Sequence, residues 1–336
     1  MGKNEQKGER KNQIISLEEA MNLASQGWLV ADLHVHTFYS YDVVPTREVD
    51  PLFLYERARA RGMSFVSFTD HDSMEAYDRI GWTREGVIPG VEVKIFDPKR
   101  VGHTVHLNVY TLNKKQFEEI EKIAQEAQNI ELLIKYLETE NLPFIFNHPF
   151  WHEPGEKLKA TVVADLTEMF PILEYNFGRI RKLNQLMLEL AAKKNKGVIA
   201  GTDSHTGDIG RVFSLAKGND FREFFEAIKK GDSRLVIEDL TFIRIKQEIW
   251  HRLEMLLDSQ KWVIDKEGLR METGSALADK IIKILADSKE EVISIKKELL
   301  KLVTLVVSWS GVPASLYLKK QNLLANRIQQ ELSLTL

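Results

Sequence analysis

Short apolar runs alternate with amphipathic stretches over the first two thirds of the chain. The runs are rich in Val, Ile, Phe and Tyr, which favours buried strands. They lie at residues 29–33, 64–69, 87–93, 104–110, 144–146, 172–175, 198–200 and 235–237, and the stretches with helical spacing between them lie at 50–61, 115–140, 178–196 and 220–230. This alternation predicts parallel βα units in an α/β fold, either a barrel or a doubly wound sheet.

Two local patterns refine this expectation. The run 104–110 follows 87–93 too closely for a helical crossover, so a hairpin or a short inserted pair is expected there. Ser16 and Glu19 have the spacing of a capping box, which predicts a short helix over 16–25.

The pattern changes near residue 238, after which the chain shows long helical segments and one short extended piece near 262–264. We therefore expect a polar tail and short leading helix (1–28), with residues 1–12 disordered, an α/β domain (29–237) and a helical extension of unknown role (238–336). Residues 302–318 carry no charge and contain Gly311 and Pro313. Their number is at the lower limit for crossing a bilayer. We expect them to form a buried or partner-covered helix followed by a turn, and a membrane segment is the less favoured alternative.

Composition narrows the possible functions. The 336 residues are 43% hydrophobic and 28% charged, as in ordinary folded domains, and the net charge of −3 provides no overall basic field for nucleic acid. The chain has no cysteine, which excludes disulfides, thiolate catalysis and iron–sulfur clusters. The polar first 12 residues do not resemble a signal peptide, so a cytoplasmic location is expected.

Histidines and carboxylates gather at the ends of the predicted strands. In parallel α/β folds these ends converge on one face, where loops build the active site. The residues concerned are Asp32, His34, His36, Asp70, His71, Asp72, Glu92, His148, Glu174, Asp203 and His205, with His106 inside a strand and His103 just before it.

The spacing of these residues adds geometry. In Asp32-Leu-His34-Val-His36, the two-residue period of an extended chain puts both imidazoles on one side, and Asp203-Ser-His205 repeats the device. Any one of these histidines could simply be a hydrogen-bonded loop residue. Burying all of them with the carboxylates would be costly without cations, so the set predicts a polynuclear metal site.

An ordered set of motifs resembles one known family. The motifs are Asp32-Leu-His34-Val-His36-Thr37 with Ser40 and Asp42, Thr69-Asp70-His71-Asp72, Pro89-Gly90-Val91-Glu92, Asn147-His148-Pro149 and Gly201-Thr202-Asp203-Ser204-His205. Over residues 29–237 the chain is similar to the PHP (polymerase and histidinol phosphatase) superfamily. The resemblance implies a distorted (β/α)7 TIM-like barrel, here with a C-terminal helical extension, and a cluster of two or three divalent metals at the strand ends.

The resemblance also implies the ligands. They are His34, His36, Asp42, His71, Glu92, His106, His148, Asp203 and His205, with Glu92 bridging two metals and His103 as the alternative to His106. Nitrogen and oxygen ligands suit zinc, manganese or iron. Asp70 could orient His71, and Glu174 could support the site or contact substrate.

The predicted chemistry is metal-assisted hydrolysis of a phosphoester, in which the cations neutralise the phosphate and activate a water. We expect catalytic roles for Glu92, Asp70 and His205. The proton donor to the leaving group is left open among Asp70, His103 and, if it is not a full metal ligand, His205. Arg179, Arg211 and Lys94 are candidate substrate-binding residues because phosphate favours cationic donors, although Arg179 and Arg211 also fit solvated charges at helix starts.

Several functions remain open on the sequence alone. The first is a phosphatase or phosphodiesterase acting on a small molecule or nucleotide. The second is a nuclease acting on short single-stranded nucleic acid, and the third is a non-enzymatic scaffold that acts through the extension. The partners expected are a small phosphorylated substrate and a second copy of the chain bound through residues 238–336, where 281–285 and 299–307 offer apolar faces. Duplex nucleic acid and membrane are not expected.

Overall fold

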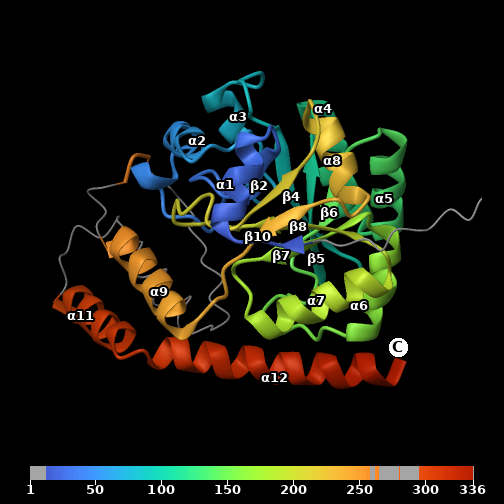
Figure 1. Ribbon diagram of the computed structural model, residues 1–336. Helices are drawn as coiled ribbons and strands as arrows, with labels where there is room; N and C mark the ends of the chain where they lie inside the picture. The colour runs from blue at the N-terminus through green and yellow to red at the C-terminus, as the bar shows by residue number, and fades with distance from the viewer. Residues whose placement is uncertain (1–12, 258–261, 265–279, 281–294, 336) are drawn as a thin grey trace, which may run out of the picture.

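Ten strands form two five-stranded sheets in the computed structural model, which describes residues 13–257, 262–264, 280 and 295–335 (Figure 1). The first sheet has the order β1-β10-β9-β2-β3 and the second has the order β4-β5-β6-β7-β8. The strands are β1 (Gln13–Ile14), β2 (Leu29–Val35), β3 (Phe65–Phe68), β4 (Gly90–Phe96), β5 (Thr104–Tyr110), β6 (Phe144–Phe146), β7 (Ile172–Asn176), β8 (Gly197–Gly201), β9 (Phe213–Ala216) and β10 (Arg234–Val236).

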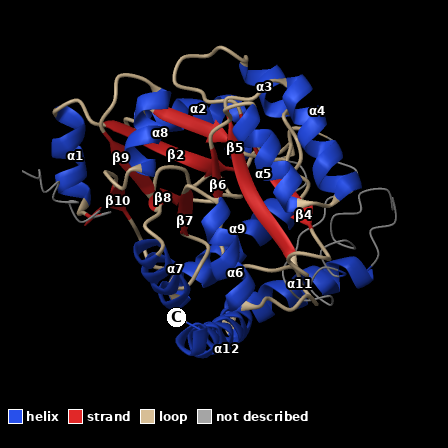
Figure 2. Cartoon of the chain, turned by 90° about the vertical axis from the view of Figure 1, so that its right-hand side faces the viewer, coloured by secondary structure: helices blue, strands red, loops and turns tan. Residues whose placement is uncertain are grey.

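Helices surround the sheets, as Figure 2 shows from a second direction. The α-helices are α1 (Leu17–Ser25), α2 (Pro51–Ala60), α3 (Glu75–Ile80), α4 (Lys114–Lys122), α5 (Ile130–Thr139), α6 (Ala160–Leu166), α7 (Arg181–Lys193), α8 (Phe221–Lys229), α9 (Phe242–Leu257), α11 (Ile295–Trp309) and α12 (Val312–Thr335). Short turns of other helix types are η1 (Arg47–Val49), η2 (Ile123–Ala127) and η3 (Thr167–Met169). The α/β class predicted from the alternating pattern is confirmed.

A closed (β/α)7 barrel is not formed as one continuous sheet. The bridges Val66–Val87 and His71–Glu92 connect β3 to the β4 side, and Val35–Ser204 connects β2 to the segment after β8, but these bridges are isolated. In addition, β5 is antiparallel to both β4 and β6. The predicted hairpin of 87–93 with 104–110 is therefore confirmed, and it is the reason that the parallel βα pattern is interrupted, because a hairpin has no crossover helix.

The single amphipathic stretch expected at 115–140 is divided. It forms α4, the π-helical turn η2 and α5. Gln128 adopts a left-handed backbone with φ of 49°, and the Asn129 side chain accepts a hydrogen bond from the backbone N–H of Leu132 at 2.9 Å. A left-handed residue ends one helix and an asparagine cap starts the next, so local capping overrides the continuous periodicity.

The first sheet contains strands that the sequence pattern did not indicate. β9 pairs antiparallel with both β2 and β10, and β1 pairs with β10 inside the region expected to be a tail and leading helix. The leading helix itself is confirmed as α1, where the Ser16 hydroxyl accepts from the N–H of Glu19 at 3.1 Å. The expected disordered tail at 1–12 lies outside the described residues.

The helical extension shares the core of the α/β part. Ala325, Ile328 and Leu332 of α12 belong to the same buried cluster as the strands. Glu331 accepts a hydrogen bond from the N–H of Ala160 at 2.8 Å, and α12 lies beside α6 and α7 in Figure 1. The short extended piece near 262–264 is also present, as a bridge between Thr46 and Trp262. The division at residue 238 stays a prediction.

The apolar stretch 302–318 is only partly as expected. Its turn falls at Ser310–Gly311, between α11 and α12. Several of its side chains face outward in the described part of the chain, with Leu302 59% and Trp309 70% exposed. Among the described helices, none is long and apolar enough by itself to cross a membrane. Lys301–Trp309 and Val312–Ser333 have the length and apolar composition of a membrane span only when taken together, and a 59° bend separates them. The predicted apolar segment 281–285 lies outside the described residues.

If α12 belongs to the main core, removing its buried apolar contacts destabilises the whole protein. We expect Ile328→Ala, at a fully buried position, to lower the free energy of unfolding by about 2–5 kcal/mol. Leu323→Ala on the same helix, where the side chain is 61% exposed, should change it by less than about 0.5 kcal/mol. Urea unfolding followed by circular dichroism measures both, and a separate early transition of the extension would contradict the shared core.

Candidate metal centre

Two histidines at the end of β2 begin the site. His34 and His36 project to one side of the extended chain, are fully buried, and have their Nε2 atoms 3.2 Å apart. Glu92 of β4 faces them, with its Oε2 at 3.2 Å from His34 Nε2 and 3.3 Å from His36 Nε2. The geometry expected from the two-residue period is thus present, and the bridge between Glu92 and His71 brings the two sheets together here.

The predicted ligands come together from distant parts of the sequence. Three groups have ligand atoms within 4.8 Å of one another. They are His36, Asp42, His71 and His205; His34, His36, Glu92 and Asp203; and His71, Glu92 and His106. His148 completes the predicted nine, with its Nε2 at 3.1 Å from Glu92 Oε1. The groups share His36, His71 and Glu92, so they form one connected cluster.

Buried polar residues hold the ligands in orientation. Glu174 lies 2.6 Å from His34 Nδ1, and the Asn147 amide donates to Glu92 Oε1 at 2.7 Å. The Asn176 amide donates to both Glu174 and Asp203 at 3.0 Å. Ligands whose second atoms are hydrogen-bonded in this way keep their orientation. The position of Glu174 agrees with a supporting role, which the sequence had left open.

The backbone is strained at three residues around the site. Asp72, His148 and Asp203 have φ values of 47°, 26° and 51°. Non-glycine residues rarely adopt this left-handed region, and they persist there only when surrounding contacts impose it. The His148 N–H donates to Glu174 and the Asp203 N–H to the carbonyl of His34, and these bonds fix the two ligand loops.

Electrostatics within the cluster favour bound cations. Burial by itself lowers the pKa of His71, but the charges of Glu92 and Asp42 outweigh it and raise that pKa to about 10. Burial raises the pKa of Glu92, yet His34, His71 and His106 hold it well below its ordinary value. Burial also raises the pKa of Asp203, but His34 and the other histidine neighbours hold that pKa well below its ordinary value. The carboxylates therefore stay ionised and require nearby positive charge, which either protons on imidazole or metal ions can supply.

The donor set fits divalent cations. His106 Nε2 is buried with no hydrogen-bond partner among the described residues, and His71 Nδ1 makes no hydrogen bond there but lies 3.1 Å from Glu92 Oε2. Imidazole nitrogens and carboxylate oxygens are ligands for zinc, manganese and iron. The choice of His106 over His103 is also consistent with this geometry, because His106 Nδ1 lies 3.2 Å from Glu92 whereas His103 interacts with Glu156 and His152.

The structure shows what the other predicted catalytic residues contact. Asp70 accepts hydrogen bonds from the N–H and hydroxyl of Thr37, both at 2.6 Å, and so anchors the loop that follows His36. Asp32 anchors the opposite loop by accepting from Thr202 and Gly210. His205 Nε2 is 2.8 Å from Asp42 Oδ2, and its ring stacks on that of His36.

The three predicted substrate-binding cations have different surroundings. Arg211 pairs with Asp208 at 2.7 Å and Glu238 at 3.4 Å, and Lys94 pairs with Glu153. Arg179 differs, because its Nε is buried with no hydrogen-bond partner among the described residues. Its guanidinium therefore keeps an open donor.

Three further residues lie around the centre, and of these only Trp151 has a signal in the sequence. Tyr41 stacks on His71 with ring centroids 4.9 Å apart, and Trp151 lies 4.3 Å from the His106 ring. Arg252 of α9 interacts electrostatically with Asp42 and Asp203. Trp151 follows the His148 motif closely and could be suspected from sequence, but Arg252 lies far from every motif and gave no signal.

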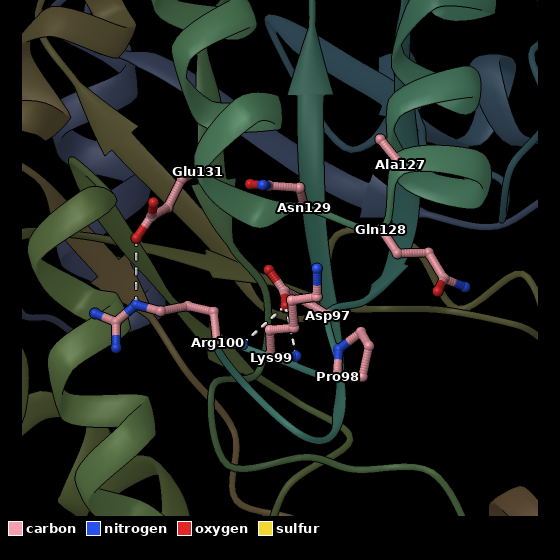
Figure 3. Close-up of a pocket in the computed structure, with 8 residues that line it drawn as sticks. All are labelled: Asp97, Pro98, Lys99, Arg100, Ala127, Gln128, Asn129 and Glu131. Atoms are coloured by element: carbon pink, nitrogen blue, oxygen red, sulfur yellow. Dashed lines mark hydrogen bonds and ion pairs between the residues drawn. The ribbon is translucent and has the colours of Figure 1, made fainter.

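A surface hollow elsewhere carries none of the predicted ligands. Figure 3 shows it at the turn after β4, lined by Asp97 to Arg100, Ala127 to Asn129 and Glu131. Asp97 accepts from the N–H groups of Lys99 and Arg100, and Arg100 pairs with Glu131. These side chains satisfy one another, so the hollow is explained as turn structure.

No protein-family model matches the chain, and no curated protein sequence matches it. Solved structures with a similar course of the chain include PsfC from Pseudomonas syringae, with 15% identity and a TM-score of 0.48, covering 68% of this chain and 99% of that one. A protein named as a metal-dependent phosphoesterase from Bifidobacterium adolescentis has 18% identity and a TM-score of 0.36, covering 54% and 90%. Endonuclease Q has 17% identity and a TM-score of 0.41, covering 60% and 56%.

One partner prediction needs correction. A small phosphorylated substrate with no duplex nucleic acid was expected, but the Endonuclease Q structure is a complex with a 27-mer duplex substrate. The prediction is therefore wrong. Its physical weakness is that the net charge of −3 is a sum over the whole chain, whereas attraction of a phosphate backbone depends on the local field, to which bound cations contribute strongly.

Metal uptake should release protons. At pH 7 in the metal-free protein, His71 with its pKa of about 10 carries a proton, and the carboxylates around His34 raise its pKa well above the ordinary value despite its burial. Both must lose that proton to bind a cation, so affinity should rise with pH until the raised pKa values are passed. Calorimetric titration of Zn²⁺ in two buffers of different ionisation enthalpy measures the release, and equal heats in both buffers would contradict it.

Glu174 should support metal binding without being a ligand. We expect Glu174→Gln to weaken metal affinity by roughly 10- to 100-fold, because the amide cannot hold His34 Nδ1–H as a carboxylate does. Glu189→Gln, on the exposed face of α7, is the matched control and should leave affinity unchanged. Competition with a fluorescent chelator gives both values, and equal affinities would remove Glu174 from the centre.

Proposed function

We propose that the protein hydrolyses a phosphoester with a cluster of two or three divalent cations. The observation that carries the proposal is the connection of three ligand groups through His36, His71 and Glu92. Such sharing suits cations only a few ångström apart, as in enzymes that stabilise both the attacking and the leaving oxygen of a phosphoryl group. The ligand roles are those predicted from sequence for His34, His36, Asp42, His71, Glu92, His106, His148, Asp203 and His205.

The protein's own residues prepare the site for this reaction. Cations held there would supply Lewis acidity and lower the pKa of a bound water. Glu92 sits between the ligand groups and keeps them at a fixed separation, while Asn147 fixes the carboxylate plane of Glu92. Glu174 and Asn176 hold His34 and Asp203 from behind. Tyr41 stacks on the ring of His71, and Trp151 packs against the ring of His106, so both imidazoles are held by an aromatic neighbour.

Substrate binding and proton transfer need further residues. Arg179 is the candidate for the phosphate because its buried Nε has no hydrogen-bond partner among the described residues. Of the three groups considered as proton donors, His205 has 10% of its side chain exposed, whereas Asp70 and His103 are 0% and 1% exposed as residues. Exposure thus favours His205 for contact with the leaving group if it is not itself a full metal ligand.

The proposal is tested by metal analysis combined with a substrate panel. Purified full-length protein should contain divalent metal and hydrolyse at least one member of a panel of nitrophenyl phosphates, nucleotides, single strands and duplexes with and without an abasic site. Glu92→Gln and Asp203→Ala should each lower the rate of hydrolysis by more than the roughly 10- to 100-fold expected for a residue that only orients a ligand.

Asp165→Asn, on the exposed face of α6, serves as the charge-matched control and should retain wild-type turnover and metal content. Wild-type protein that takes up no metal on reconstitution with zinc, manganese or iron would contradict the proposal. Full turnover in both ligand variants would contradict it equally.

A further inference from the structure

Helix α9 packs directly against the loop that carries Asp42. Leu253, Met255 and Leu256 of the helix form one buried cluster with Phe38, Val43, Val44 and Val49. His251 adds a polar contact to the same region, with its Nε2 at 2.9 Å from Glu48 Oε2. This helix lies in the predicted extension, which had no role on sequence grounds, yet it packs beside the loop of Asp42, a member of one of the ligand groups.

A polar chain ties the same helix to the other side of the centre. The Thr206 hydroxyl, next to His205, donates to Glu248 at 3.2 Å, and Arg252 Nε donates to the same Glu248 oxygen at 3.1 Å. The guanidinium is thus anchored through one edge to the loop that follows Asp203 and His205. The position of the guanidinium therefore depends on two sets of contacts, those of α9 with the loop of Asp42 and that of Glu248 with Thr206.

Arg252 lies on α9 between Glu248, which accepts from the loop after His205, and Leu253, which packs on the loop of Asp42. Burial tends to lower its pKa, but Glu248, Asp42 and Asp203 together raise it, and Arg252 in turn contributes to lowering the pKa of His205. The side chain keeps 32% of its surface exposed. Among the described residues, only Glu248 takes a hydrogen bond from it, so its terminal Nη donors are open.

A permanent cation beside a site that binds metal cations needs an explanation. Repulsion between Arg252 and the cations would weaken the site unless an anion lies between them. A phosphoryl group satisfies this requirement, because its oxygens can contact metal ions on one side and a planar guanidinium fork on the other. The stability of α9 does not explain why an arginine stands here. A partly exposed Arg–Glu pair four residues apart adds little to the stability of a helix.

We propose that Arg252, supplied by the helical extension, binds the phosphoryl group of the substrate at the metal centre, an inference that rests on the proposed phosphoesterase function. Glu248 acts as its positioning residue through Thr206. The extension is on this view a part of the substrate site, and the α/β part alone lacks one of its anion-binding groups.

The test measures phosphate binding and turnover separately. Metal-loaded full-length wild type, Arg252→Met, Arg252→Lys and the exposed control Arg222→Met are titrated with inorganic phosphate by calorimetry and assayed on the best phosphoester. We expect Arg252→Met to weaken phosphate binding and raise KM by about 10- to 100-fold, with metal content unchanged. Arg252→Lys should recover part of the loss, since lysine keeps the charge but not the fork, and Arg222→Met should match wild type.

The outcomes separate this inference from the proposed function. Equal phosphate affinity in wild type and both Arg252 variants, or no phosphate binding by wild type, overturns the role of Arg252 even if phosphoesters are hydrolysed. Phosphate binding that depends on Arg252 without turnover of any phosphoester supports the anion site and overturns the phosphoesterase proposal. If Arg252→Met does not fold or loses its metal, the same two comparisons are decided by Arg252→Lys.

Discussion

The structure depends on the compensation of buried negative charge around Glu92. This carboxylate is fully buried and is surrounded by imidazoles from β2, β5 and the loops after β3 and β6. An isolated ionised carboxylate at such depth would be prohibitively unfavourable. Histidines must therefore converge on it, and they must carry either protons or metal ions. The same requirement explains why the two sheets meet at the bridge between His71 and Glu92.

Rigid support around the ligands follows from this requirement. Asp32 and Asp70 are themselves buried carboxylates, and each is satisfied by hydrogen bonds from a loop that carries ligands. Left-handed backbone at His148 and Asp203 is retained because neighbouring hydrogen bonds hold it there. A set of ligands held in this way changes little when cations bind, which lowers the reorganisation that metal binding and catalysis would otherwise require.

In our proposal, the helical extension binds the anionic group of the substrate that lies against the cations. α12 shares the core of the α/β part, and α9 closes over the loop of Asp42. Ionised groups on α9 then lie near the metal ligands without belonging to any motif. On this proposal, substrate selection is supplied by a segment that differs from the part of the chain with the predicted metal ligands.

The sequence by itself determined the α/β class, the hairpin at 87–110 and the placement of histidines and carboxylates at the strand ends. Two-residue and strand-end spacing are local properties, and so are the motifs that contain His34, His71 and Asp203. Tertiary structure alone decided that the sheets are joined by isolated bridges, that 115–140 is broken at Gln128, and that the helix of Arg252 packs on the loop of Asp42. Strand pairing, capping competition and helix docking depend on contacts between residues far apart in the chain, and no local pattern encodes those contacts.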